Sequence, residues 1–113
     1  MASGADLVGN WSINANGSSG GMSIFSAADD GPVELTVGFN DVNRQDNWSG
    51  TWRPETREIV LRRELPNNVV QTYTGYLGDN HPPSLIFGGS FTESDAGDFQ
   101  FGWFAQWLTW IIT

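Results

Sequence analysis

The sequence has no cysteine, no lysine and only one histidine. Without cysteine there is no disulfide framework, no thiolate metal ligand and no cysteine nucleophile. One histidine, His81, and no Asp-x-Asp-x-Asp-Gly loop leave too few ligands for a metal site. We therefore predict neither a bound metal nor a cofactor, and we assign no catalytic residue.

Positive charge and long hydrophobic runs are also scarce. The chain has five arginines and 13 acidic residues, and its net charge is −8. Nucleic acids and anionic membranes are bound by basic surfaces, so we expect neither as a partner. No run approaches the roughly 20 apolar residues that span a bilayer. Residues 1–6 are short and polar and do not resemble a signal peptide, which predicts a cytoplasmic chain or one exported as a mature form.

Eight short runs rich in β-branched and aromatic residues fill the rest of the chain. The five prolines lie between the runs or at their edges, since proline cannot donate to a sheet ladder. Short links between the runs favour sequential antiparallel neighbours. For 113 residues this predicts one domain, residues 1–113, folded as an all-β, eight-stranded antiparallel up-and-down β-barrel. The expected strands are Leu7–Ile13, Met22–Ala27, Val33–Asn40, Asn47–Arg53, Arg57–Leu65, Val69–Leu77, Ser84–Thr92 and Phe99–Trp107.

The first run, Leu7-Val8-Gly9-Asn10-Trp11-Ser12, is followed by Asn14–Gly21, which we expect to form a flexible loop, and by Met22-Ser23-Ile24. This order resembles the start of the avidin and streptavidin family, part of the broader lipocalin-like group of barrels. The resemblance implies that Asn14 and either Ser18 or Ser19 lie where that family binds the ureido oxygen of biotin. Phe39 stands where the family has a tyrosine, so the resemblance supports the barrel more than this ligand.

Strand alternation predicts a polar interior at one point of the barrel. Ile59, Leu61 and Arg63 share one face, which is the more apolar face and should point inward. Gln71 and Tyr73 share a face of the following strand. A buried arginine needs a partner, so these three residues are expected to line a pocket for an anionic or hydroxylated ligand. The alternative is that Arg63 reaches the barrel rim or pairs with an internal carboxylate.

Six tryptophans allow two interpretations. Flat aromatic rings stack on sugars, which favours a glycan or another small molecule as ligand, but core packing is the commoner role of barrel tryptophans. Joining both lines of reasoning gives one set of candidate residues. The predicted ligand-binding residues are Asn14, Ser18, Phe39, Trp52, Arg63, Gln71, Tyr73 and Trp103.

The last strand carries bulky apolar residues on both faces, which requires a cover outside its own barrel. We therefore expect a homo-oligomer built on the last two strands through Ile86, Phe104, Trp107 and Leu108. The alternative is that the terminal segment Trp110-Ile111-Ile112 folds back over that face.

Three functions fit these features. The first is a non-enzymatic barrel that binds one small ligand at its open end, near the Asn14–Gly21 loop. The second is a compact interaction module, such as a protein inhibitor or a lectin-like domain, with a filled barrel. The third is a barrel isomerase or cyclase that uses Arg63, Tyr73 and Glu64.

Overall fold

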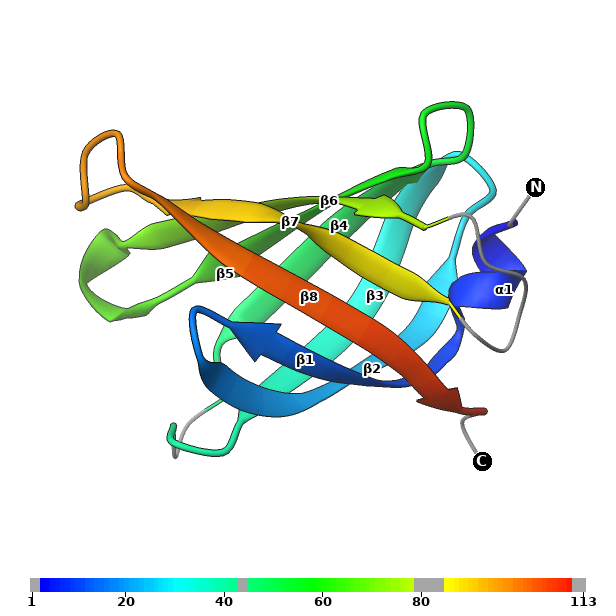
Figure 1. The fold of residues 1–113 in the computed structure, drawn as a ribbon, viewed down its shortest axis with the longest axis horizontal. Helices are drawn as coiled ribbons and strands as arrows, with labels where there is room; N and C mark the ends of the chain where they lie inside the picture. The colour runs from blue at the N-terminus through cyan, green and yellow to red at the C-terminus, as the bar shows by residue number, and fades with distance from the viewer. Residues whose placement is uncertain (1–2, 43–44, 79–84, 111–113) are drawn as a thin grey trace.

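The computed structural model describes residues 3–42, 45–78 and 85–110. Eight antiparallel strands pair in chain order, and β1 also pairs with β8, so the sheet closes into a barrel (Figure 1). The predicted fold class is thereby confirmed. The strands are β1 (Gly9–Ala15), β2 (Ser18–Ala27), β3 (Gly31–Phe39), β4 (Asn47–Arg53), β5 (Glu58–Glu64), β6 (Val70–Leu77), β7 (Ile86–Glu93) and β8 (Gln100–Thr109).

Two local predictions around β1 were wrong. Leu7 ends a short helix, α1 (Gly4–Leu7), rather than starting a strand. The expected loop Asn14–Gly21 is a tight hairpin, in which Ala15 pairs with Ser18. Asn16 and Gly17 form its turn with φ of 51° and 91°, the left-handed conformations that a two-residue hairpin of this type needs. The Asn-Gly pair makes a long loop unnecessary, because both residues adopt these angles readily.

Inward-facing side chains fill the barrel in rows that cross neighbouring strands. Ile59, Leu61 and Arg63 of β5 all point inward, as predicted, and so do Gln71 and Tyr73 of β6. The opposite faces of both strands are more exposed. The alternation therefore continues to the barrel end, where it brings charged and polar side chains inside.

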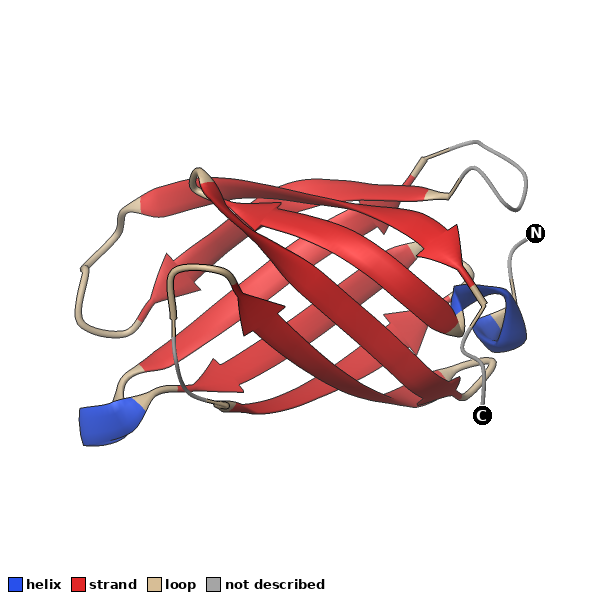
Figure 2. Ribbon diagram, turned by 90° about the horizontal axis from the view of Figure 1, so that it is seen from below, coloured by secondary structure: helices blue, strands red, loops and turns tan. Residues whose placement is uncertain are grey.

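The helix α1 lies at one end of the barrel, beside the C-terminal end of β8 (Figures 1 and 2). Leu7 is fully buried there, and the backbone carbonyl of Leu7 accepts a hydrogen bond from Trp11 Nε1 at 2.9 Å. Trp107 Nε1 donates to the Val8 carbonyl at 3.1 Å. Trp11 packs on Phe87 with ring centroids 5.2 Å apart. Two tryptophans thus attach the helix segment to an aromatic core that closes this end.

The opposite end carries the β1–β2, β3–β4, β5–β6 and β7–β8 connections (Figure 2). The β5–β6 connection is a short 3-10 turn, Pro66–Asn68, in which Asn67 and Asn68 have positive φ. No helix covers this end in the described part of the chain. The barrel is therefore closed at one end only.

Glycine at two neighbouring strand positions has opposite meanings. The indole of Trp103 lies directly against Gly75 of β6, so a Cβ atom on Gly75 would overlap the ring. Gly88 of β7 faces outward, and a Cβ atom there would meet nothing within 4 Å. The core therefore has no room for a side chain at position 75, whereas the outer surface has room for one at position 88.

We predict that Gly75→Ala destabilises the barrel by about 1–3 kcal/mol, the usual cost of forcing extra volume into a packed core. Gly88→Ala is the matched control and should leave the free energy of unfolding within about 0.5 kcal/mol of the wild type. Urea denaturation followed by tryptophan fluorescence measures both. Equal losses for the two variants would contradict the packing argument.

Candidate functional site

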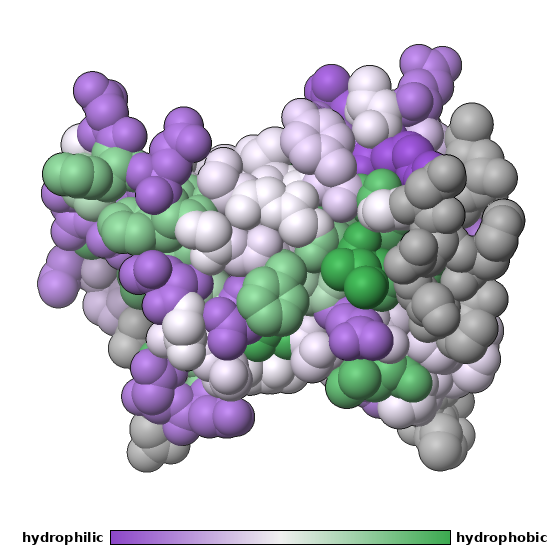
Figure 3. All heavy atoms as spheres, viewed as in Figure 1, coloured by the Kyte–Doolittle hydropathy of each residue, from purple (hydrophilic) through white to green (hydrophobic). Residues whose placement is uncertain are grey.

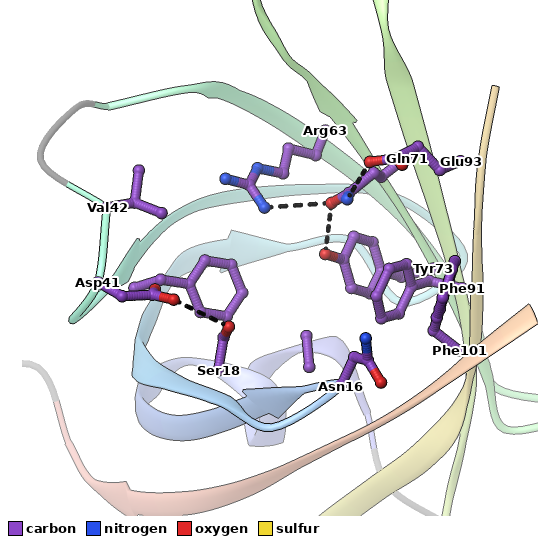
Figure 4. Close-up of a pocket in the computed structure, with 12 residues that line it drawn as sticks. Asn16, Ser18, Asp41, Val42, Arg63, Gln71, Tyr73, Phe91, Glu93 and Phe101 are labelled. Carbon is purple, nitrogen blue, oxygen red and sulfur yellow. Dashed lines mark hydrogen bonds between the residues drawn. The ribbon is translucent and has the colours of Figure 1, made fainter. Parts of the chain in front are cut away.

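A cavity of about 210 Å³ opens at the uncovered end of the barrel. Figure 4 shows aromatic rings and a hydrogen-bonded polar group on one wall and the Ser18–Asp41 pair on the other. The cavity combines the polar side chains with apolar ones from several strands. Its lining residues are Ala15, Asn16, Ser18, Phe39, Asp41, Val42, Arg63, Gln71, Tyr73, Phe91, Glu93 and Phe101.

Three polar residues lie side by side across neighbouring strands at this end. Arg63 of β5 pairs in register with Gln71 of β6, which pairs with Glu93 of β7. Arg63 Nη1 donates to Gln71 Oε1 at 3.1 Å, and Gln71 Nε2 donates to Glu93 Oε1 at 2.8 Å. Deeper in the barrel, strand alternation points apolar residues into the core. At the open end, the same alternation points a row of polar residues into the cavity (Figure 4).

Arg63 has its countercharge within the barrel end. Its Nε and Nη2 atoms lie 2.8 and 2.7 Å from Asp46 Oδ2, and the two side chains are only 8% and 6% exposed. The guanidinium carbon lies 5.1 Å from the ring centre of Phe39 and 5.5 Å from that of Trp48. Such stacking adds a favourable cation–π contact. Arg63 is therefore held by a carboxylate, an amide and two rings.

Tyr73 connects the polar row to the aromatic core. Its hydroxyl donates to Gln71 Oε1 at 2.7 Å, so this amide oxygen accepts from both Tyr73 and Arg63. The ring stacks on Phe91 with centroids 4.5 Å apart and meets the edge of Trp103 at 5.7 Å. Burial raises the pKa of Tyr73 above its usual value, and the nearby Arg63 only partly opposes this shift. The neutral phenol is consequently the form that the folded barrel favours.

Among the described residues, negative charge exceeds positive charge around the cavity. Glu93 and Asp41 line it beside Arg63, the one cation among the described lining residues, and Asp46 offsets the charge of Arg63. Asp41 accepts a hydrogen bond from Ser18 Oγ at 3.1 Å. Among the described residues, the charge of Arg63 is thus matched before any ligand arrives, and two further carboxylates remain. Of the anionic and hydroxylated ligands that the sequence left open, this balance favours the hydroxylated class.

The structure brings together five of the eight predicted ligand-binding residues. Those that line the cavity are Ser18, Phe39, Arg63, Gln71 and Tyr73. Arg63 lines the cavity, as we expected, and it also pairs with an internal carboxylate, that of Asp46.

The other three predicted residues do not line the cavity. Asn14 lies on the outer face of β1, since the neighbouring Ile13 and Ala15 point inward, and its Oδ1 accepts a hydrogen bond from the Gly17 backbone N–H at 3.0 Å. Trp52 is fully buried away from the cavity and packs against Phe87 at 5.9 Å. Trp103 is buried behind Tyr73 and donates to the Thr74 carbonyl at 3.1 Å. Trp103 supports a cavity residue without bordering the cavity itself.

The sequence analysis missed the carboxylates of the site. Asp46 precedes β4, outside any alternating run. Glu93 ends β7 on the same face as the buried Phe91, but the expected strand Ser84–Thr92 stopped one residue before it. The demand of a buried arginine for a partner was the signal that pointed to a carboxylate, but it could not say which one. Asp41 follows β3 in a connection and carried no such signal.

The enzyme hypothesis loses one of its candidate groups. Glu64 lies on the outer face of β5, half exposed and paired with Arg62, so it cannot act beside Arg63 and Tyr73. His81 lies outside the described residues. Among the residues that the structure describes, no group of three or more His, Asp or Glu side chains is placed to hold a metal ion. None of the described helices is long and apolar enough to cross a membrane.

Comparisons with known proteins give no match. No protein-family model matches the chain, and neither a curated protein nor a solved structure matches it significantly. The resemblance of the first strands to avidin therefore stays a prediction.

We predict that Arg63→Met destabilises the protein by about 3–5 kcal/mol, because it removes one partner of the buried Arg63–Asp46 ion pair. The neighbouring Arg62 supplies a matched control, since it pairs with Glu64 on the exposed face. Arg62→Met should cost about 1 kcal/mol or less, as surface pairs do. Urea denaturation at neutral pH compares the two. Similar losses in the free energy of unfolding for both variants would contradict the argument that the buried pair stabilises the protein more than the exposed one.

Tyr73 should also make stability depend on alkaline pH. Unfolding returns its raised pKa to about 10, so the unfolded chain loses this proton more readily. The contribution of Tyr73 is therefore fully present below about pH 10 and is lost as pH rises through the higher folded pKa. In the Tyr76→Phe variant, phenolate absorbance belongs to Tyr73 alone, since the chain has two tyrosines. We expect titration above pH 10 when folded and near pH 10 in urea; folded titration at or below pH 10 would contradict the burial effect.

Proposed function

We propose that this protein is a non-enzymatic binding barrel that holds one small molecule in the cavity at its open end. The observation that carries the proposal is the hydrogen-bonded row of Arg63, Gln71 and Glu93 along one side of that cavity. Binding sites for small molecules commonly combine apolar walls with a few fixed polar groups. Here the rings of Phe39, Tyr73 and other lining residues would supply the apolar walls.

The size of the cavity limits the ligand. At about 210 Å³ it is smaller than the usual 300–1,000 Å³ of ligand pockets. A cavity of about 150 Å³ accepts one benzene ring. We therefore propose a ligand of about one ring with a short polar substituent.

The charge of the site limits the ligand further. Three nitrogens of Arg63 are occupied by Asp46 and Gln71, and the Gln71 oxygen already accepts two hydrogen bonds. Glu93 and Asp41 add acceptors at the cavity. A neutral or cationic ligand with hydroxyl or amine donors matches these groups, whereas an anion would meet carboxylates with no further cation among the described lining residues. We accordingly propose the hydroxylated class and not the anionic one.

A compact interaction module remains the second proposal, and one observation favours it. Apart from the cavity, the interior is packed with aromatic and aliphatic side chains, and the cavity lies below the usual size of a ligand pocket. In that case the loops at the open end would bind a macromolecule and the polar row would serve stability alone.

Three isosteric probes separate these proposals: benzylammonium, benzyl alcohol and benzoate. We expect the cation and the alcohol to shift the NMR resonances of residues around the cavity, with benzoate at least tenfold weaker. Native mass spectrometry of protein purified from its source should also reveal a retained small molecule.

Glu93→Gln is the informative variant, because it replaces one carboxylate of the cavity wall with a neutral amide of similar shape. It should weaken benzylammonium more than benzyl alcohol. Glu64→Gln, on the outer face of β5, is the matched control and should change neither affinity. Tighter binding of benzoate than of benzylammonium would overturn the charge argument. Absence of binding by all three probes, with no retained molecule, would favour the interaction module.

A further inference from the structure

Charge is distributed unevenly around the outside of the barrel. The chain holds 18 charged residues, yet the outer faces of five adjacent strands, β6, β7, β8, β1 and β2, carry none. The single charged residue within these strands, Glu93, lines the cavity. Figure 3 shows this side of the molecule, where pale and green atoms cover much of the middle and purple atoms crowd the ends. We call the outer surface of these five strands the uncharged face.

Large apolar side chains stand on the uncharged face. Phe104 and Leu108 of β8 are both 55% exposed, and Ile86 of β7 is 39% exposed. The expectation that Trp107 lies on this surface was wrong, because its side chain belongs to the buried core. Single exposed hydrophobic residues are common on protein surfaces, but neighbouring ones on a charge-free surface mark interaction sites.

Glycines leave a shallow depression in the surface beside these protruding side chains. Gly88 lies directly across from Phe104 on the neighbouring strand, and Gly102 lies two residues before it. A Cβ atom at either glycine would meet nothing within 4 Å, so the surface there is open. A projecting ring next to a hollow is a self-complementary shape, since one two-fold rotation places each ring over the hollow of the other copy.

We propose that the uncharged face binds a second copy of this chain, forming a two-fold symmetric dimer with Phe104 packed over Gly88 and Gly102 of the other copy. The distribution of the charge supports a second copy as the occupant, although the net charge of −8 by itself opposes self-association. Two copies repel each other wherever their acidic surfaces meet, and the uncharged face is the surface on which that repulsion is least. A cationic partner would instead be drawn to the acidic parts of the barrel.

The size of the face sets the expected strength. The five strands, spaced about 4.8 Å apart and each about seven residues long, offer on the order of 550 Å² per copy. Two copies would then bury about 1,100 Å² in total, the lower end for specific interfaces. We therefore expect a reversible dimer with a dissociation constant in the micromolar range.

Sedimentation equilibrium across about 1–300 µM tests the dimer. The wild type should pass from monomer to dimer in this range. Phe104→Glu should weaken dimerisation at least tenfold, because it places two carboxylates close to the two-fold axis. Phe99→Glu is the matched control: Phe99 is 73% exposed but lies before β8, outside the uncharged face, so the change should be less than twofold.

A pairing experiment distinguishes a specific interface from general loss of hydrophobicity. Phe104→Lys should also fail to dimerise alone, whereas an equal mixture with Phe104→Glu should recover association, since opposite charges then meet at the axis. Circular dichroism checks that both variants fold. A wild type that stays monomeric to 300 µM, equal effects of the Phe104 and Phe99 variants, or no recovery in the mixture would each overturn the proposal. A monomer that floats with phosphatidylcholine vesicles would assign the face to lipid instead.

Discussion

The buried guanidinium of Arg63 is the constraint around which the open end of the barrel is arranged. A charge that is removed from water must be paired and hydrogen-bonded, and Asp46 and Gln71 do both. Gln71 then needs partners for its own amide, which Glu93 and Tyr73 provide. Each polar group is thus present because the previous one requires it. The result is a barrel end where apolar side chains do not fill the whole interior.

The closed end follows the opposite rule. There the core is aromatic, and the indole N–H groups of Trp11 and Trp107 donate to the backbone carbonyls of Leu7 and Val8 at the end of α1. Gly75 leaves room for the ring of Trp103, which in turn packs against Tyr73. Trp103 therefore links the two halves: the rigid aromatic core fixes the position of the tyrosine whose hydroxyl belongs to the polar row.

The sequence could predict the barrel and the inward direction of Arg63, Gln71 and Tyr73, because strand alternation is a local property that persists over several residues. Asp46 and Glu93 were missed because both lie at the ends of strands, where the sequence pattern does not set the bounds or the register. Their places beside Arg63 and Gln71 follow from the register of neighbouring strands. Asn14 was misplaced for a different reason. The Asn16-Gly17 pair makes a two-residue turn, and a run of small polar residues does not reveal by composition where such a turn ends and the next strand begins.

Strand alternation also separates the two proposed surfaces. In β8, Phe101 and Trp103 point toward the cavity region and the core, whereas Phe104 lies on the uncharged face. Because successive side chains point to opposite faces of a sheet, one strand can serve a binding cavity and a dimer interface with different residues. The cavity opens at the end of the barrel and the uncharged face lies along its side. Dimerisation through this face would therefore leave the mouth of the cavity accessible in both copies. One chain could then bind a ligand and a second copy at the same time.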